Sequence, residues 1–205
     1  MADAVIDIHT GALWGYYRYV GVYKVGDPSK SQKLALALGL PQVLLGQPED
    51  HSFVYEAAKE GKPVASVWIG GGPGLRDYRQ DDMTRIKNTV MNAMKQMQML
   101  DYDANLESET VDVLDLHTIL KTPAERGFIF MNKEKRGSRV KAGEKLGEII
   151  HPFTGNMIAE ILAPRDGIVV HAGVVMPLAP DNSTLMMIGN LLEHYHPPQI
   201  PSGIH

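Results

Sequence analysis

The stretch Ala4-Val5-Ile6-Asp7-Ile8-His9-Thr10-Gly11 decides how the fold of this chain is interpreted. An apolar run that ends in polar residues and a glycine is typical of a buried parallel strand whose carboxyl end carries function. His9 therefore stands where a catalytic metal ligand often lies. A catalytic zinc normally takes three protein ligands and one water, and almost nothing precedes His9 to supply the others. The sequence thus predicts one ligand of a metal site, His9.

Composition excludes several classes of function. The 205 residues suffice for one large domain or two small ones, and the net charge is −4. The short basic run Lys133-Glu134-Lys135-Arg136 is most simply a solvated turn, so no nucleic-acid partner is expected. Without cysteine there are no disulfides and no thiolate ligands. No apolar stretch approaches the roughly 20 residues that span a bilayer, and no signal-peptide pattern is visible. We expect a cytoplasmic protein without a membrane partner.

Residues 1–105 alternate between strand and helix signals, which predicts an α/β domain with a parallel or mixed sheet. Gly39 and Gly61 are the expected helix stops, and Asp50 or Ser52 is the expected cap of the middle helix. Strands are predicted at residues 41–45 and 63–69, and helices at residues 29–38, 53–58 and 82–100.

The last of these helices carries an apolar stripe at intervals of three or four residues. We interpret its methionines as core filler rather than as a metal or cofactor site. The stripe consists of Met83, Ile86, Val90, Met94 and Met97.

Residues 106–190 have a different sequence pattern, in which glycine, proline and asparagine separate short runs of β-branched residues. This pattern predicts a small all-β domain, with strands at residues 128–131, 145–150, 157–162 and 167–170. The proline-rich tail, residues 191–205, is expected to be extended or loose.

Three groups of residues, in this order and spacing, carry a resemblance to a known family. They are Asp7-Ile-His9-Thr-Gly11, the run from Gly61-Lys-Pro63 through Trp68-Ile-Gly70-Gly-Gly72, and the pair Val140-Lys-Ala-Gly143-Glu-Lys-Leu-Gly147 with Ile161-Leu-Ala-Pro164-Arg-Asp-Gly167. Together they resemble the succinylglutamate desuccinylase/aspartoacylase family of zinc-dependent deacylases, relatives of the zinc carboxypeptidases. The last pair also echoes biotinyl and lipoyl carrier domains. However, Phe153-Thr-Gly155-Asn156 stands in place of their Met-Lys attachment pair, so a swinging-arm carrier is not expected.

The resemblance implies a zinc-carboxypeptidase-like mixed sheet with helices, incomplete at its N-terminus, followed by a small all-β domain. It implies zinc as cofactor, His9 as the third zinc ligand, and a loop of Gly70, Gly71 and Gly72 that binds substrate. The implied substrate class is a small N-acyl amino acid, whose amide bond is cleaved.

The sequence departs from the family at its metal ligands. The family takes its first two zinc ligands from a His-x-x-Glu segment upstream of the strand that ends in His9. That segment and an arginine-bearing substrate segment are absent, and none of the eight histidines has Glu three residues on. His51, after Glu49-Asp50, most simply belongs to a helix start. The two histidines of His194-Tyr195-His196 could bind a metal, although histidines near a proline-rich tail are more often ordinary surface residues.

A second departure concerns the general base, a carboxylate two residues before the first glycine of the family's loop. The matching residue here is Trp68, whose indole donates a hydrogen bond but cannot accept a proton. Losing a positioned base costs about 10²–10⁴ in rate. Glu56 or Asp77 would have to take its place.

Three hypotheses follow. In the first, the chain is part of a zinc-dependent amide hydrolase that an N-terminal segment or partner completes. In the second, it is a non-catalytic relative that binds a small molecule or a partner subunit. In the third, His9 is simply a satisfied histidine at a strand end. Because the opening strands of the family's sheet are absent, we expect an apolar face or edge that a homo-oligomer or a heteromeric N-terminal partner covers.

Overall fold

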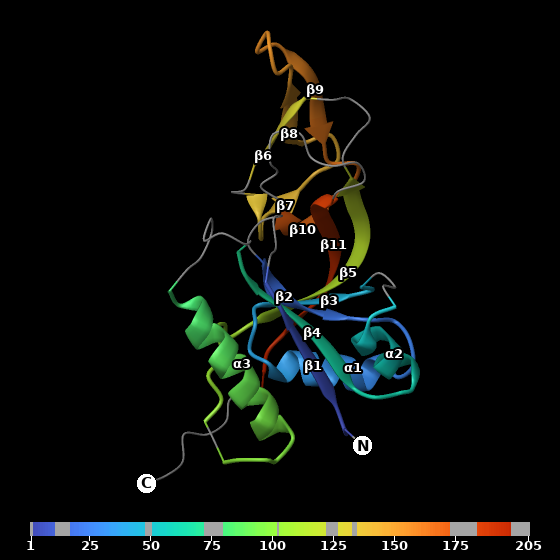
Figure 1. The fold of residues 1–205 in the computed structure, drawn as a ribbon, viewed down its shortest axis with the longest axis vertical. Helices are drawn as coiled ribbons and strands as arrows, with labels where there is room; N and C mark the ends of the chain where they lie inside the picture. Colours follow the sequence, from blue (N-terminus) through green and yellow to red (C-terminus); the bar gives the residue numbers. More distant parts are fainter. Residues whose placement is uncertain are drawn as a thin grey trace.

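The computed structural model describes residues 2–10, 17–47, 51–71, 80–101, 103–121, 127–132, 135–172 and 184–197. Strands and helices alternate in the first half, and strands follow in the second (Figure 1). The helices are α1 (Pro28–Ala37), α2 (Phe53–Lys59) and α3 (Asp82–Gln96). The strands are β1 (Val5–His9), β2 (Tyr17–Val22), β3 (Gln42–Leu45), β4 (Val64–Gly70), β5 (Val111–Lys121), β6 (Phe128–Met131), β7 (Arg139–Val140), β8 (Lys145–Ile150), β9 (Met157–Leu162), β10 (Gly167–Ala172) and β11 (Thr184–Tyr195).

The main sheet of the described residues has eight strands in the order β1-β4-β2-β3-β5-β11-β10-β7. Strand β1 is parallel to β4, and β3 is parallel to both β2 and β5. Strand β2 is antiparallel to β4, and β5, β11, β10 and β7 follow as antiparallel neighbours. The mixed sheet with helices, followed by a small β unit, confirms the fold class predicted from the sequence.

Local signals place the first two helices where the sequence predicts them. Pro28 opens α1, and the Asp27 carboxylate accepts a hydrogen bond from the Lys30 backbone N–H at 3.3 Å. Ser52 caps α2, because its hydroxyl accepts from the Tyr55 backbone N–H at 3.1 Å. Gly39 takes a φ of 85° just after α1, which confirms the expected stop at a left-handed residue.

The two faces of the main sheet bury different clusters. On one face, valines of β2, β3 and β4 pack against Leu34 and Ala35 of α1 and Ala93 of α3. On the other face, Tyr17, Tyr19, Leu44 and Leu114 pack against Ile168 and Val170 of β10. Side chains alternate between the faces of a strand, so neighbouring residues of β2 serve opposite cores.

The apolar stripe of α3 lies only partly against the core: Ile86 packs against it, but the two ends of the stripe do not. Met83 is 62% exposed and Met97 is 37% exposed, so the interpretation of the methionines as core filler is wrong for these two. The buried residues of α3 are Asp82, Thr89, Asn92 and Ala93. Asn92 turns this side of the helix inward because its amide donates to the Leu38 carbonyl at 3.1 Å and to the Asn105 carbonyl at 3.0 Å.

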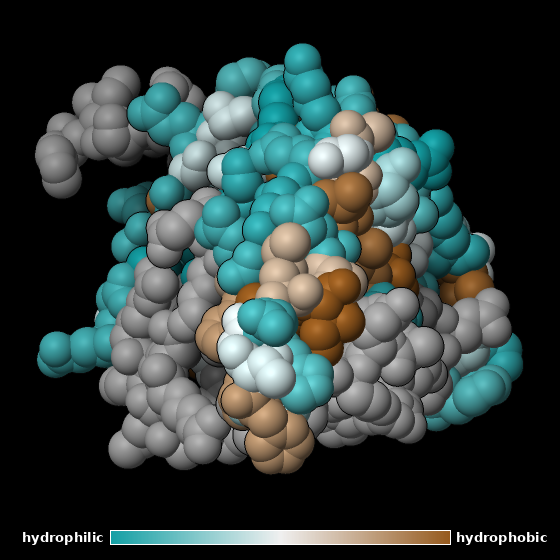
Figure 2. Space-filling model, turned by 90° about the horizontal axis from the view of Figure 1, so that it is seen from above, coloured by the Kyte–Doolittle hydropathy of each residue, from teal (hydrophilic) through white to brown (hydrophobic). Residues whose placement is uncertain are grey.

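The second sheet, β6-β8-β9, forms the opposite end of the molecule from the helices (Figure 1). Strand β8 lies in its centre and is antiparallel to both neighbours. Figure 2 looks down on this end and shows apolar side chains among polar ones. Phe130, Met157 and Leu162 are exposed here, as expected for an antiparallel sheet that is covered on one face.

The main sheet runs across the domain division expected at residue 105. Residues Gln42–Leu45 of β3 pair with Asp112–Asp115 of β5, and β11 extends past residue 190 to Tyr195. Whether the parts before and after residue 105 fold independently stays a prediction. No helix in the described part of the chain is long and apolar enough to cross a membrane.

Candidate functional site

His9 is the last residue of β1 and lies directly beside Trp68 of β4 in the register of the sheet. Its Nε2 atom is 2.7 Å from the Asp7 carboxylate, which is on the same face two residues earlier. Both side chains are a little more than one-third exposed. The structure therefore brings together the metal-ligand candidate and the residue at the general-base position of the resemblance.

Trp68 covers the His9 ring. The two rings stack with centroids 4.4 Å apart and an interplanar angle of 15°. The indole Nε1 is buried and has no hydrogen-bond partner among the described residues. Since an indole only donates a hydrogen bond, Trp68 gives this position a flat apolar wall with one free donor.

Three further rings extend this pair into what we term the aromatic cluster: His9, Tyr17, Tyr19, Trp68 and His171. The Tyr17 ring lies 5.3 Å from the Trp68 ring and stacks on His171 at 4.0 Å, with 5° between the planes. Tyr19 stacks on Trp68 at 6.3 Å. Burial raises the pKa of the Tyr17 and Tyr19 hydroxyls far above the usual range, so both stay neutral.

His171 is fully buried, with neither ring nitrogen hydrogen-bonded within the described ranges. Burial, with a smaller contribution from the charge of Arg136, lowers the pKa of His171 to about 3. The ring is therefore neutral at physiological pH. Sequence reasoning missed Tyr17, Tyr19 and His171. A histidine inside the apolar run Ile168-Val-Val-His171-Ala172 was a usable signal for an unusual buried group.

The glycine loop begins at the edge of the aromatic cluster, because Gly70 pairs with Tyr17 in the register of β4 and β2. Gly70 has a φ of 88°, and a Cβ there would lie 3.1 Å from the Asp82 carboxylate. Both facts favour glycine. Gly71 is half-buried, and Gly72 lies outside the described residues. Substrate binding by Gly70, Gly71 and Gly72 stays a prediction.

The described residues do not fit a zinc site on their own. No group of three or more histidine, aspartate or glutamate side chains in these ranges could hold a metal ion. His9 brings only Asp7 with it, whereas zinc sites use three or four ligands. The zinc implied by the resemblance therefore lacks support from this part of the chain.

The other candidate ligands and bases lie elsewhere. His51 is 4.0 Å from Glu56 of α2, and Glu56 also pairs with Lys59 at 3.0 Å. The His194 ring of β11 lies 2.7 Å from the Asp112 carboxylate of β5, and these strands stand five and four places from β1 in the sheet. His196 lies 3.5 Å from the Thr110 hydroxyl. Glu49 and Asp77 lie outside the described residues.

Comparison with known proteins identifies the fold. No protein-family model matches the sequence, and no curated protein matches it. Solved structures do match. The ectoine utilization protein EutE (DoeB) from Ruegeria pomeroyi, with product bound, superposes with a TM-score of 0.79 at 18% identity, over 93% of this chain and 59% of that one. A succinylglutamate desuccinylase/aspartoacylase from Rhodobacter sphaeroides gives 0.79 at 17% identity, over 94% and 60%. An aspartoacylase family protein from Mesorhizobium loti gives 0.72 at 20% identity, over 94% and 58%.

The chain therefore has the fold of succinylglutamate desuccinylase/aspartoacylase family proteins, which confirms the resemblance found in the sequence at the level of the fold. It spans about 60% of the length of the structures that it matches.

Proposed function

We propose that this chain is part of a deacylase-type hydrolase that cleaves the amide bond of a small N-acyl amino acid. In this proposal a further polypeptide, either an N-terminal segment or a partner subunit, supplies the zinc ligands that the described residues lack. One observation carries the proposal. Almost the whole chain superposes on structures of this family, in a fold where His9 ends β1 directly beside Trp68 of β4.

The edge strand of the main sheet supports the proposal that a further polypeptide completes the site. Strand β1 stands at the end of the strand order, with β4 as its neighbour among the described strands. Ile8 of β1 is 39% exposed. An edge strand with unpaired backbone groups is a template for pairing. About 40% of each matched structure lies outside the superposed part, which is enough chain to cover such an edge.

Within the proposed hydrolase, the chain's own residues have separable roles. Asp7 holds the His9 ring through the 2.7 Å contact to Nε2, and Trp68 fixes its plane by stacking. The buried rings of Tyr17 and His171 close the site from the side of β10. None of these roles involves zinc, because the described residues alone do not form a zinc site.

A second candidate, a non-catalytic binding subunit, is favoured by Trp68. The indole occupies the general-base position of the resemblance and stacks on His9. It cannot accept a proton from water. In this reading the site binds an N-acyl amino acid or a partner without hydrolysing it.

A fusion protein tests both candidates. The segment of Ruegeria pomeroyi EutE that precedes the matched region is joined to Met1, and the fusion is assayed for zinc by elemental analysis and for hydrolysis of N-acetyl and N-succinyl amino acids. We expect the fusion to bind zinc and to lose it in the His9→Ala variant. His196→Ala, a histidine outside the aromatic cluster, is the control and should keep the metal.

The fusion carrying Trp68→Glu separates the two candidates. Hydrolysis by the unaltered fusion that Trp68→Glu raises by about 10² or more supports the hydrolase, because a positioned base contributes about that much. Hydrolysis by the Trp68→Glu fusion alone supports the non-catalytic subunit. Zinc binding without hydrolysis in both fusions supports the non-catalytic subunit. A folded fusion that binds no zinc contradicts the proposal.

A further inference from the structure

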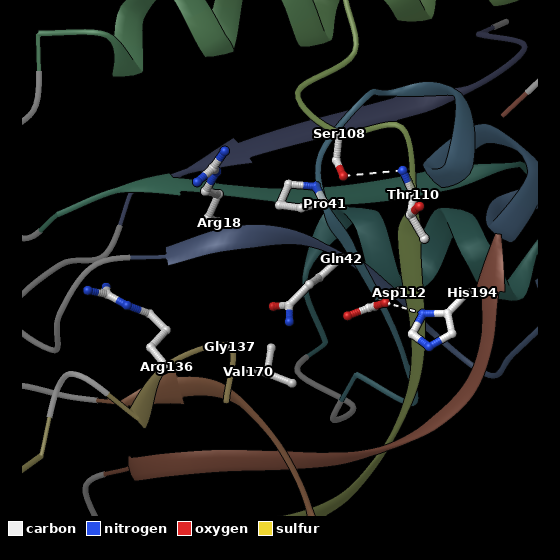
Figure 3. A pocket seen from close by; sticks show the side chains of 10 residues that line it. All are labelled: Arg18, Pro41, Gln42, Ser108, Thr110, Asp112, Arg136, Gly137, Val170 and His194. Carbon is white, nitrogen blue, oxygen red and sulfur yellow. Dashed lines mark hydrogen bonds and ion pairs between the residues drawn. The ribbon is translucent and has the colours of Figure 1, made fainter. Parts of the chain in front are cut away.

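A cavity of about 480 Å³ opens where β3 and β5 begin and β11 ends (Figure 3). Its walls come from strands and loops that lie far apart in the sequence. None of the lining residues belongs to the aromatic cluster, and β5 stands four places from β1, which carries His9. The lining residues used below are Arg18, Gln42, Asp112, Arg136, Val170 and His194.

Three polar side chains of the cavity stand in one row across three neighbouring strands. Gln42 of β3 and His194 of β11 both lie opposite Asp112 of β5 in the register of the sheet. Residues that are paired in register project to the same face of a sheet. The next pair along β3 and β5 on this face is Leu44 with Leu114, which belong to the core cluster on the side away from the helices. The row therefore forms the polar end of an apolar sheet face.

The Asp112 carboxylate is the strongest hydrogen-bond acceptor of this row. Its Oδ1 atom lies 2.7 Å from His194 Nδ1. An ionised carboxylate only accepts, so Nδ1 donates, and this bond fixes the orientation of the carboxylate. Within the described residues, Asp112 Oδ2 has no partner. Figure 3 shows the Asp112 carboxylate and the Gln42 amide directed toward the middle of the cavity. The row can therefore accept further hydrogen bonds from the N–H groups of a ligand.

Neither arginine of the lining forms an ion pair with Asp112. Arg18 projects from β2 to the helix face of the sheet, where its Nε donates to Glu107 Oε2 at 2.6 Å. In Figure 3 Arg136 stands at the far margin of the cavity, with Gln42 between it and Asp112. The charge that the row itself presents to the cavity is therefore negative, and a ligand bound to it carries positive charge.

We propose that this cavity binds a small planar cation with several N–H donors, of the guanidinium or amidinium class. The N–H groups of the cation donate to the Asp112 carboxylate, the Gln42 amide adds an acceptor beside it, and the apolar part of the ligand lies toward Val170 of β10. A planar guanidinium forms two parallel N–H···O bonds with a carboxylate, whereas an ammonium acts as a point charge. The proposal does not depend on the deacylase function, because it uses no residue of the aromatic cluster.

NMR titrations of the unaltered chain with three probes test the proposal. The probes are butylguanidinium, butylurea, which is planar but uncharged, and butylammonium, which is charged but lacks the planar fork. We expect butylguanidinium to bind with a dissociation constant of about 1 mM or lower, and at least about tenfold more tightly than either other probe. The amide signals of Gln42, Asp112 and His194 should shift. Equal affinity for either other probe would overturn the proposal. Absence of saturable binding, or shifts confined to His9 and Trp68, would overturn it as well.

Variants assign the charge that is recognised. Asp112→Asn keeps the shape of the side chain and removes its charge, so it should lower the affinity for butylguanidinium at least about tenfold. Two controls should leave the affinity unchanged: Asp115→Asn on the same strand, whose carboxylate pairs with Lys24 at 2.5 Å, and Arg18→Gln on the helix face. Thermal unfolding shows whether each variant folds, and the comparison of probes in the unaltered chain decides the question if Asp112→Asn does not. Unchanged binding in folded Asp112→Asn would overturn the proposal.

Discussion

Replacing His171 by phenylalanine should remove part of the acid sensitivity of the folded chain. In the native structure burial lowers the pKa of His171 to about 3, whereas its ordinary value is 6.5. The unfolded chain therefore takes up a proton at this residue as the pH falls through 6.5, and the folded chain does not until about pH 3. The stabilising effect of the neutral ring is complete above pH 6.5 and is lost progressively between 6.5 and about 3.

The size of the effect follows from proton linkage. Each pH unit below 6.5 lowers the free energy of unfolding by about 1.4 kcal/mol for this group. Going from about pH 8 to about pH 5 therefore removes about 2 kcal/mol through His171 alone. A side chain at position 171 that does not titrate should abolish this part of the pH dependence, whatever its own packing does to stability.

Urea denaturation at the two pH values measures the effect. The difference in free energy of unfolding between about pH 8 and about pH 5 should shrink by about 2 kcal/mol in both His171→Phe and His171→Leu. Val170→Ala is the control, because it disturbs the same core without removing a titrating group. It should lower stability equally at both pH values. An unchanged pH difference in both His171 variants would refute the account of a buried neutral ring.

Further predictions address the helices and the domain division. Asn92→Ala should lower the free energy of unfolding by about 3 kcal/mol, because two carbonyls and the Asn105 N–H lose their partner. Gln96→Ala, on the exposed side of α3, should change it by less than about 0.5 kcal/mol in the same denaturation assay. Gly39→Ala should destabilise more than Gly61→Ala, which should cost about 1–2 kcal/mol. Both glycines have positive φ, but only at Gly39 would a Cβ lie 2.6 Å from Asn92 Nδ2. Limited proteolysis should cut first within residues 101–109 if the division at residue 105 separates two folding units, and resistance of that segment would mean one unit.

The strands that sequence reasoning found are short β-branched runs, such as those that became β3, β4 and β8. Four strands were missed: β2, β5, the two-residue β7 and β11. In β5, Asp112 and Asp115 interrupt the apolar residues because the strand is half-buried over much of its length. The order of the strands in the sheet could not be predicted either, because β3 pairs with β5 through residues that lie 70 positions apart in the sequence, such as Gln42 and Asp112.

The methionine stripe of α3 shows a different limit. Periodicity identified one apolar face of the helix, but it could not say what that face packs against. In the structure Asn92 makes hydrogen bonds with two backbone segments, and this fixes the rotation of the helix. Met83 is left largely exposed as a result.

The candidate site was predicted in part. The resemblance placed His9 and Trp68 in one site, and the register of β1 and β4 puts them side by side. Tyr17 and His171 could not be found in this way, because β2 was not predicted as a strand and β10 reaches the cluster only through tertiary packing. The same is true of Asp112 and His194, whose contact depends on the pairing of β5 with β11.

The central claim is that this chain has a deacylase fold whose described residues do not hold zinc by themselves. Elemental analysis of the purified chain, without a fusion partner, tests it most directly. The account predicts clearly substoichiometric zinc that dialysis removes, since His9 with Asp7 falls short of the three or four ligands of a stable site. One tightly bound zinc per chain, lost in the His9→Ala variant, would contradict the account.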